Sequence, residues 1–305
     1  MELVQLGNAR GVRFSKVVSF GNACDLNEAD FIEYFAHDLQ TRVIVGYIEG
    51  TKDGRRFING LQKAAGVKPV IMLKGGVTEG GIKAAASHTG ALAGSTVMWD
   101  TLFHQLGVMQ VYNLEEALDL ILLFQHLKPL RGRRAGLIIA GGGFSVVGTD
   151  SCEREGIIVP VFPPEVRRRL KETVCKELGP GTIIHNPVDL SFWESNPRIL
   201  SPVIETIANY DDIDFILTYT GLGVGLYSMY EVVDKRIDAL IQAKKSVDKP
   251  IIAVIRHTDD SEGADYSFSL QKRCLEASIP VFPSFGRAAH AINSFVQYYE
   301  MRDKQ

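Results

Sequence analysis

Residues 68–95 read KPVIMLKGGVTEGGIKAAASHTGALAGS, and this stretch decides how the first half of the chain folds. It opens on a short apolar run typical of a buried strand and continues into a segment rich in Gly, Ala, Ser and Thr. A compact domain rarely keeps a connection of roughly twenty residues without regular structure unless the connection has a function. Glycine allows unusual backbone shapes, and small side chains keep the bulk low. We therefore expect a mobile loop that fits closely around an anion and carries one ionisable nucleophile, His88.

The composition excludes several classes of protein. The chain has 305 residues, of which 46% are apolar, enough for two domains of ordinary size. Its 33 basic and 36 acidic residues give a net charge of −3, which provides no general reason to expect nucleic acid or an anionic membrane as a partner. The four cysteines form no CxxC pair, so a zinc ribbon or redox motif is unsupported. No signal sequence or membrane span of about 18 apolar residues is visible, and we expect a soluble, cytoplasmic protein.

Short Val- and Ile-rich runs alternate with amphipathic stretches of helical length, which predicts an α/β fold with mainly parallel sheets. The strands are expected at residues 16–20, 43–48, 69–73, 108–111, 135–140, 215–219, 251–255 and 281–282. The segment KPLRGRR at 128–134 breaks the pattern with Pro, Gly and four charges, so the predicted domains are 1–129 and 130–305. Residues 2–11 resemble the tail of a helix without its preceding strand, which suggests a chain truncated at its N-terminus.

The imidazole of His88 suits phosphoryl transfer. Its unperturbed pKa is about 6.5, so the neutral ring is a good nucleophile near pH 7. A phosphoryl group on a ring nitrogen is labile and can be passed onward. Such a site needs a carboxylate to fix the ring and a group of donors to hold the phosphate. The alternative is a surface histidine without a role.

Glu49 is the best candidate for that carboxylate. It follows the apolar run VIVGYI and precedes Gly50, so it should lie at the carboxyl edge of a parallel sheet, where ligands gather. The next strand leads directly into the His88 segment. A solvated charge at a strand end is the alternative.

The second half offers a candidate anion site. The run GGGFSVVG at 141–148 follows a predicted strand and opens a helix, so its exposed N–H groups and the helix dipole favour a phosphate. Val146 breaks the dinucleotide pattern GxGxxG, Thr149 stands where a P-loop needs lysine, and Val147 breaks the hydrolase pattern GxSxG. A tight strand–helix turn that needs glycine is the alternative.

Other motifs carry less weight. HNPVDLSFW at 185–193 has a proline that stiffens a turn and an aspartate placed to bridge backbone groups, so we expect a structural role. TGLGVG at 220–225 is a weak candidate for lining a site. His37, His104 and His126 are expected on helices, as surface or packed residues. No HExxH or similar spacing occurs, so no metal site is predicted.

Several segments together resemble the NDP-forming acyl-CoA synthetases, relatives of succinyl-CoA synthetase. In order along the chain they are GVRFSKVVSFGNACDLNEADFIEYF, YIEGTKDGRRF, KPVIMLKGG, SHTGALAGS and NPVDL. The resemblance implies two flavodoxin-like, succinyl-CoA synthetase-like three-layer domains. It also implies that His88 is the phosphorylated histidine and that Glu49 steadies it. The implied phosphate-binding residues are Gly142, Gly143, Phe144 and Ser145, with Thr89 and Gly90 beside the histidine.

The chain differs from the usual arrangement of the family in its domains. No CoA-binding Rossmann domain and no ATP-grasp domain is visible, so the resemblance covers the two central domains alone. It implies that CoA and ATP or ADP are substrates of the complete enzyme, with Mg accompanying the nucleotide. It also implies a CoA-binding domain and an ATP-grasp domain or subunit as partners, in a homo- or hetero-oligomer.

The sequence thus predicts the phosphohistidine-bearing core of an ADP-forming acyl-CoA synthetase. The complete reaction interconverts acyl-CoA, ADP and phosphate with free acid, CoA and ATP. A non-catalytic binding or assembly module derived from the same family is the alternative. A nicotinamide-dependent oxidoreductase is disfavoured because the dinucleotide pattern is broken.

Overall fold

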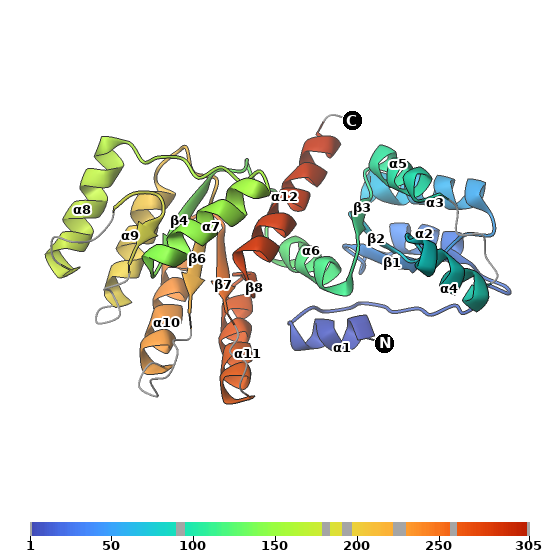
Figure 1. The fold of residues 1–305 in the computed structure, drawn as a ribbon, viewed down its shortest axis with the longest axis horizontal. Helices are drawn as coiled ribbons and strands as arrows, with labels where there is room; N and C mark the ends of the chain where they lie inside the picture. The colour runs from blue at the N-terminus through green and yellow to red at the C-terminus, as the bar shows by residue number, and fades with distance from the viewer. Residues whose placement is uncertain are drawn as a thin grey trace. The chain divides into compact units, whose positions relative to one another are not determined.

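The computed structural model describes residues 2–89, 95–178, 184–190, 197–221, 230–256 and 261–303. The chain divides into two compact units. The first unit comprises Met1–Asn8, Val12–Ile121 and Gln297–Gln305, and the second comprises Ala9–Gly11 and Leu122–Val296. Figure 1 shows a sheet with flanking helices in each unit, which confirms the predicted α/β class.

The first unit is built on a parallel three-stranded sheet. Its strands, in the order β1-β2-β3, are β1 (Ile44–Ile48), β2 (Val70–Lys74) and β3 (Met109–Val111). The helices that begin in this unit are α1 (Glu2–Ala9), α2 (Glu28–His37), α3 (Gly54–Val67), α4 (Glu79–Thr89), α5 (Thr96–Leu106) and α6 (Leu114–His126). Buried side chains from α2, α3 and α5 meet those of β1 and β2 in one apolar core.

Local sequence signals set the ends of these helices. Asn27 begins α2 with a capping box, because its side chain accepts from Ala29 N and Asp30 accepts from Asn27 N. Asp53 begins α3 by accepting from Arg56 N. Gly107 ends α5 in the left-handed conformation, with φ of 67°, which glycine adopts without strain.

The predicted strand at residues 16–20 is wrong. This segment has no regular secondary structure and joins no sheet. Side chains hold it instead, since Lys16 Nζ donates to Asp38 Oδ2 over 2.8 Å. Val17 and Val18 are exposed, so the apolar run does not mark a buried strand here.

The predicted irregular loop between residues 74 and 95 is also wrong in part. Helix α4 (Glu79–Thr89) occupies much of it, and His88 belongs to the last turn of this helix. Thr78 starts α4 by accepting from Gly81 N. The alanines that suggested low bulk are also the strongest helix formers, and they outweigh the glycines.

The second unit has a parallel five-stranded sheet in the order β5-β4-β6-β7-β8. Its strands are β4 (Ala135–Ile139), β5 (Val188–Asp189), β6 (Phe215–Thr220), β7 (Ile251–Ile255) and β8 (Val281–Phe282). Its helices are α7 (Gly142–Arg154), α8 (Pro164–Leu178), the 3₁₀ helix η2 (Pro197–Ile199), α9 (Leu200–Ala208), α10 (Tyr230–Ser246), α11 (Ser261–Glu276) and most of α12 (Phe285–Arg302).

Helix α7 lies close against β4. A Cβ atom at Gly148 would come within 2.9 Å of Ile139 Cδ1 and 3.0 Å of Phe285 Cζ, so the helix can approach this closely only with glycine there. Buried side chains of β4, β6, β7 and the helices α8 to α11 form a continuous core on one side of the sheet. Within the described parts of the chain, no helix is long and apolar enough to cross a membrane.

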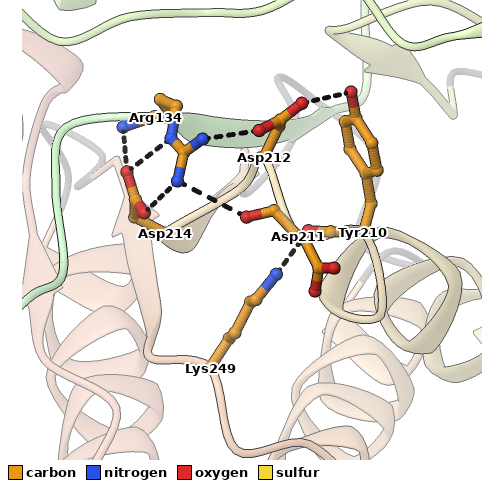
Figure 2. A network of polar contacts seen from close by, with 6 residues as sticks. All are labelled: Arg134, Tyr210, Asp211, Asp212, Asp214 and Lys249. Carbon is orange, nitrogen blue, oxygen red and sulfur yellow. Dashed lines mark hydrogen bonds and ion pairs between the residues drawn. The ribbon is translucent and has the colours of Figure 1, made fainter.

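An ion-pair network fixes the edge of the second sheet where β4 and β6 begin (Figure 2). Asp214 accepts from Arg134 three times: from the backbone N over 2.8 Å, from Nε over 3.1 Å and from Nη2 over 2.9 Å. Arg134 also donates to Asp212 over 2.7 Å, and Asp212 accepts from the Tyr210 hydroxyl over 2.9 Å. The Asp214 side chain is 2% exposed and that of Asp212 59% exposed.

We expect Asp214→Asn to lower the free energy of unfolding by about 2 kcal/mol, because hydrogen bonds between charged groups in a buried setting are lost. Urea unfolding followed by circular dichroism measures this change. Asp212→Asn is the matched control and should cost at most about 1 kcal/mol, since this pair is exposed. Equal effects of the two substitutions would contradict the anchoring role of Asp214.

The same carboxylate gives a pH dependence. Burial alone would raise the pKa of Asp214, but the hydrogen bonds and charge of Arg134 outweigh it and lower the pKa below its usual value. The stabilisation is complete above the unfolded pKa of about 3.9 and is lost as pH falls through the lower folded pKa. Wild type should therefore lose more stability than Asp214→Asn between about pH 5 and pH 2 in urea titrations.

Candidate functional site

Glu49 lies at the carboxyl edge of the first sheet, as predicted. It directly follows β1, and the parallel register pairs Ile48 with Lys74, the last residue of β2. Gly75 N donates to Ile48 O over 2.9 Å and extends the pairing one residue beyond the strand. The end of β1 and the beginning of the connection after β2 therefore lie side by side.

Two residues hold Glu49 in place. The Tyr47 hydroxyl donates to Glu49 Oε1 over 2.9 Å. Lys74 Nζ donates to the backbone carbonyl of Glu49 over 2.7 Å. Glu49 Oε2 is buried. One neighbour thus fixes an oxygen of the carboxylate, and the other fixes the backbone that carries it.

Lys74 is a buried cation. Only 3% of the residue is exposed, and Nζ donates also to the carbonyl of Gly75. The ammonium lies 5.3 Å from the ring centroid of Trp99, within the range of a cation–π interaction. Burial lowers the pKa of Lys74, while the charge of Glu49 acts in the opposite direction. Positive charge is therefore held next to Glu49.

Helix α4 packs against the connection that leaves β2. Gly76 has φ of 71°, and a Cβ atom there would lie 3.2 Å from Ala85 Cβ, so the connection and the helix are in close contact. Thr96 Oγ1, at the start of α5, donates to Val77 O over 2.8 Å and ties α5 to the same connection. His88 follows Ala85 by about one helical turn.

The pairing of Glu49 with His88 stays a prediction. The backbone of His88 and Thr89 belongs to α4, but the structure does not describe their side chains. Gly90 lies outside the described residues. The structure places the helix that carries His88, and the strand end that carries Glu49, in the same unit.

The predicted phosphate-binding turn lies in the second unit. Gly141 has φ of 119°, a conformation that requires glycine, and α7 begins at Gly142. The Ser145 hydroxyl donates back to Gly141 O over 3.2 Å. The ring of Phe144 stacks on Tyr219 with 4.8 Å between centroids, while Gly143 faces open space. The first turn thus combines a glycine-dependent bend with backbone N–H groups typical of anion sites, and its role stays a prediction.

Asp189 lies directly beside this turn. Its Oδ1 accepts from Gly141 N over 3.0 Å, and its Oδ2 would lie 3.6 Å from a Cβ atom built on Gly142. Asn186 accepts from Leu137 N over 2.8 Å and so bridges backbone groups as well. These contacts confirm the structural role predicted for the NPVD segment. They also place a negative charge next to the positive end of α7, which opposes binding of an anion there.

Tyr47, Lys74 and Trp99 are the residues that sequence reasoning missed. Tyr47 and Glu49 stand two positions apart, and side chains with this spacing point to the same face of a strand, so the sequence did contain a signal. Lys74 interrupts an apolar run at its last position. Its partners come from β1 and α5, and the contact emerges only from the register of the sheet.

Other motifs of the sequence add little to the site. Residues 222–225 of the TGLGVG segment lie outside the described residues. His37, His104 and His126 lie on α2, α5 and α6, on helices as predicted. Among the described side chains, no group of three His, Cys, Asp or Glu residues could hold a metal ion.

Comparisons with known proteins point to one family. Residues 1–124 match the family model described as "Succinyl-CoA ligase like flavodoxin domain". The α subunit of acetate–CoA ligase (ADP-forming) I from Pyrococcus furiosus is 30% identical over 96% of this chain and 60% of its own length. Acetate–CoA ligase (ADP-forming) from Methanocaldococcus jannaschii is 41% identical over 59% of this chain and 25% of its own length.

Solved structures show the same fold. Acetyl-coenzyme A synthetase 1 of Ca. Korarchaeum cryptofilum, in complex with phosphate and ADP, aligns with a TM-score of 0.80 and 25% identity. The alignment covers 99% of this chain and 62% of that one. A crystal structure of a protein from Pyrococcus horikoshii OT3 aligns with a TM-score of 0.77 and 21% identity. The chain therefore spans less than two thirds of the length of these relatives.

The charge of Asp189 gives a testable consequence at the start of α7. Asp189→Asn keeps an acceptor for Gly141 N but removes the negative charge, so we expect inorganic phosphate to bind the chain at least roughly threefold more tightly. Isothermal titration with inorganic phosphate measures the affinity. Asp150→Asn, the same charge change later in α7, should leave it unchanged. An affinity of Asp189→Asn equal to that of wild type would show that α7 does not hold the anion.

Proposed function

Residues 1–124 match the model of succinyl-CoA ligase-like flavodoxin domains, and the chain is similar to ADP-forming acetate–CoA ligases. From this similarity we propose a phosphoryl-relay function. In this proposal the chain is the phosphohistidine-bearing core of an ADP-forming acyl-CoA synthetase. His88 carries the phosphoryl group between an acyl phosphate and a nucleotide.

The observation that supports the proposal best is the position of Glu49. Its carboxylate lies at the carboxyl edge of the first sheet, the edge from which the connection to α4 leaves β2. The last turn of α4 carries His88 within SHTGALAG. A buried carboxylate oxygen near a nucleophilic histidine can accept the ring N–H, orient the ring and raise its basicity.

The proposed chemistry is a pair of displacements at phosphorus. One ring nitrogen of neutral His88 attacks the phosphorus of an acyl phosphate, the bond to the acyl oxygen breaks, and the free acid leaves as a carboxylate. The other ring nitrogen keeps its proton, which Glu49 holds while the ring is positively charged. A terminal phosphate oxygen of ADP then attacks the phosphohistidine, which yields ATP and restores neutral His88. Fixed dipoles and charges around the phosphoryl group favour both steps.

The start of α7 is proposed to bind phosphate through the backbone N–H groups of Gly142, Gly143, Phe144 and Ser145. The helix dipole favours an anion there, and the small residues leave the backbone accessible. Thr89 and Gly90, beside the histidine in the sequence, are proposed separately as phosphate contacts of the first unit. Asp189 limits the affinity of the turn, as described above.

The remaining substrates and partners follow from the relatives. The P. furiosus relative is named as an α subunit, and the relatives compared above are longer than this chain. We propose CoA and ATP or ADP as substrates of the complete enzyme, with Mg arriving on the nucleotide. A CoA-binding domain and an ATP-grasp domain or subunit would supply the remaining sites, and the assembly would be an oligomer.

Phosphorylation of the chain tests this function. Incubation with ³²P-labelled acetyl phosphate should give acid-labile, base-stable label on wild type and none on His88→Gln. Glu49→Gln should be labelled at least about tenfold more slowly, because the ring loses its charged partner.

His104→Gln is the matched control, because His104 is exposed and lies on α5. It should be labelled like wild type. Label that persists in His88→Gln contradicts the assignment of the nucleophile. A wild-type chain that takes no label from acetyl phosphate, nor from labelled ATP with an ATP-grasp subunit, would instead be a non-catalytic module.

A further inference from the structure

We propose that Tyr47 is a positioning residue, whose hydroxyl fixes Oε1 of Glu49 so that Oε2 receives the N–H of the His88 ring. This inference deepens the proposed function and rests on it. It assigns separate partners to the two carboxylate oxygens and sets how basic the imidazole becomes.

The first observation is the geometry of Tyr47 and Glu49. The hydroxyl donates to Oε1 over 2.9 Å, and the two residues lie two positions apart on the same face of β1 and its extension. Tyr47 is 59% exposed, so its ring fills little of the core. Partial desolvation of Tyr47 and its bond to Glu49 both raise the pKa of Tyr47, so the hydroxyl stays a donor at neutral pH.

The second observation is that Gly75, which has no side chain, leaves space for the Tyr47 hydroxyl. Gly75 follows β2 two residues after Leu73, the partner of Tyr47 in the sheet, and a Cβ atom on Gly75 would lie 2.6 Å from the Tyr47 oxygen. Gly75 does not have a positive φ, so its backbone would tolerate a side chain. The contact with Tyr47 is therefore what opposes a larger residue at this position.

The third observation is the backbone tether. Lys74 Nζ donates to the backbone carbonyl of Glu49 over 2.7 Å, so the backbone that carries the carboxylate is fixed. Lys74 thus holds the backbone of Glu49, and Tyr47 holds Oε1 of its carboxylate. The second oxygen of this carboxylate, Oε2, is buried.

The contacts of Glu49 should affect the pKa of the His88 imidazole. Among the described residues, the titratable groups shown to act on Glu49 are Tyr47 from β1 and Lys74 from β2. Both draw negative charge away from the carboxylate, so Glu49 attracts the protonated ring less than an isolated carboxylate would. Tyr47 and Lys74 thereby limit how far Glu49 raises the basicity of the ring.

The experiment measures the pKa of His88 directly. The seven histidines are labelled with ¹³C, the ring signals are followed by NMR from pH 5 to pH 9, and His88→Gln identifies the His88 signal. Tyr47→Phe should raise the pKa of His88 by roughly 0.3 to 1 unit, because Glu49 loses a donor and attracts the protonated ring more strongly. Gly75→Ala displaces the hydroxyl without removing it and should shift the pKa in the same direction.

Tyr34→Phe is the matched control, since Tyr34 is 52% exposed and lies on α2. It should leave the His88 pKa unchanged. Unchanged values in both Tyr47→Phe and Gly75→Ala overturn the positioning role. Circular dichroism and amide spectra identify any variant with a disturbed fold, and the exposed site of Tyr47 makes Tyr47→Phe the decisive one.

Glu49→Gln separates this inference from the proposed function. It should lower the pKa of His88, opposite to the effect of Tyr47→Phe, because the negative partner is lost. If Glu49→Gln lowers the pKa and Tyr47→Phe does nothing, the Tyr47 role fails while the Glu49–His88 pair stands. If Glu49→Gln also does nothing, the pair itself fails and the Tyr47 role fails with it.

Discussion

The pairing of β1 with β2 beyond their last residues is the constraint on which the candidate site depends. Gly75 N donates to Ile48 O, so the backbone after one strand is fixed against the end of the other. The same register, which pairs Ile48 with Lys74, brings Glu49 within reach of Lys74 and the Tyr47 hydroxyl close to Gly75. The carboxyl edge of a parallel sheet is where strand ends from distant parts of a chain converge, which is why ligand sites gather there.

Strand ends also meet at the carboxyl edge of the second sheet, but there a carboxylate lies beside the start of a helix. The ends of β4 and β5 meet at Gly141 and Asp189, and the carboxylate accepts the N–H of the glycine before α7 begins. The turn therefore has two features that act against each other: a helix start that attracts anions and a carboxylate that repels them. The balance between them sets the affinity for phosphate.

The sequence predicted the sheets better than the details of the site. Runs such as VIMLK and AGLII are buried on both faces and marked β2 and β4 clearly. The strand predicted at residues 16–20 is absent because Val17 and Val18 are apolar yet exposed. A side-chain hydrogen bond from Lys16, rather than a sheet, holds that segment. Helix α4 was missed because its alanines were weighed as small rather than as helix formers. The contacts of Glu49 depend on the register between two strands, which single-chain periodicity does not encode.

The contact between Glu49 and His88 is the central claim, and a crystal structure of the chain phosphorylated on His88 tests it most directly. The account predicts that Glu49 Oε2 lies within about 3 Å of the unphosphorylated ring nitrogen, with Oε1 still bound by the Tyr47 hydroxyl. A ring nitrogen more than about 5 Å from both carboxylate oxygens would contradict it, because no hydrogen bond could then orient the ring.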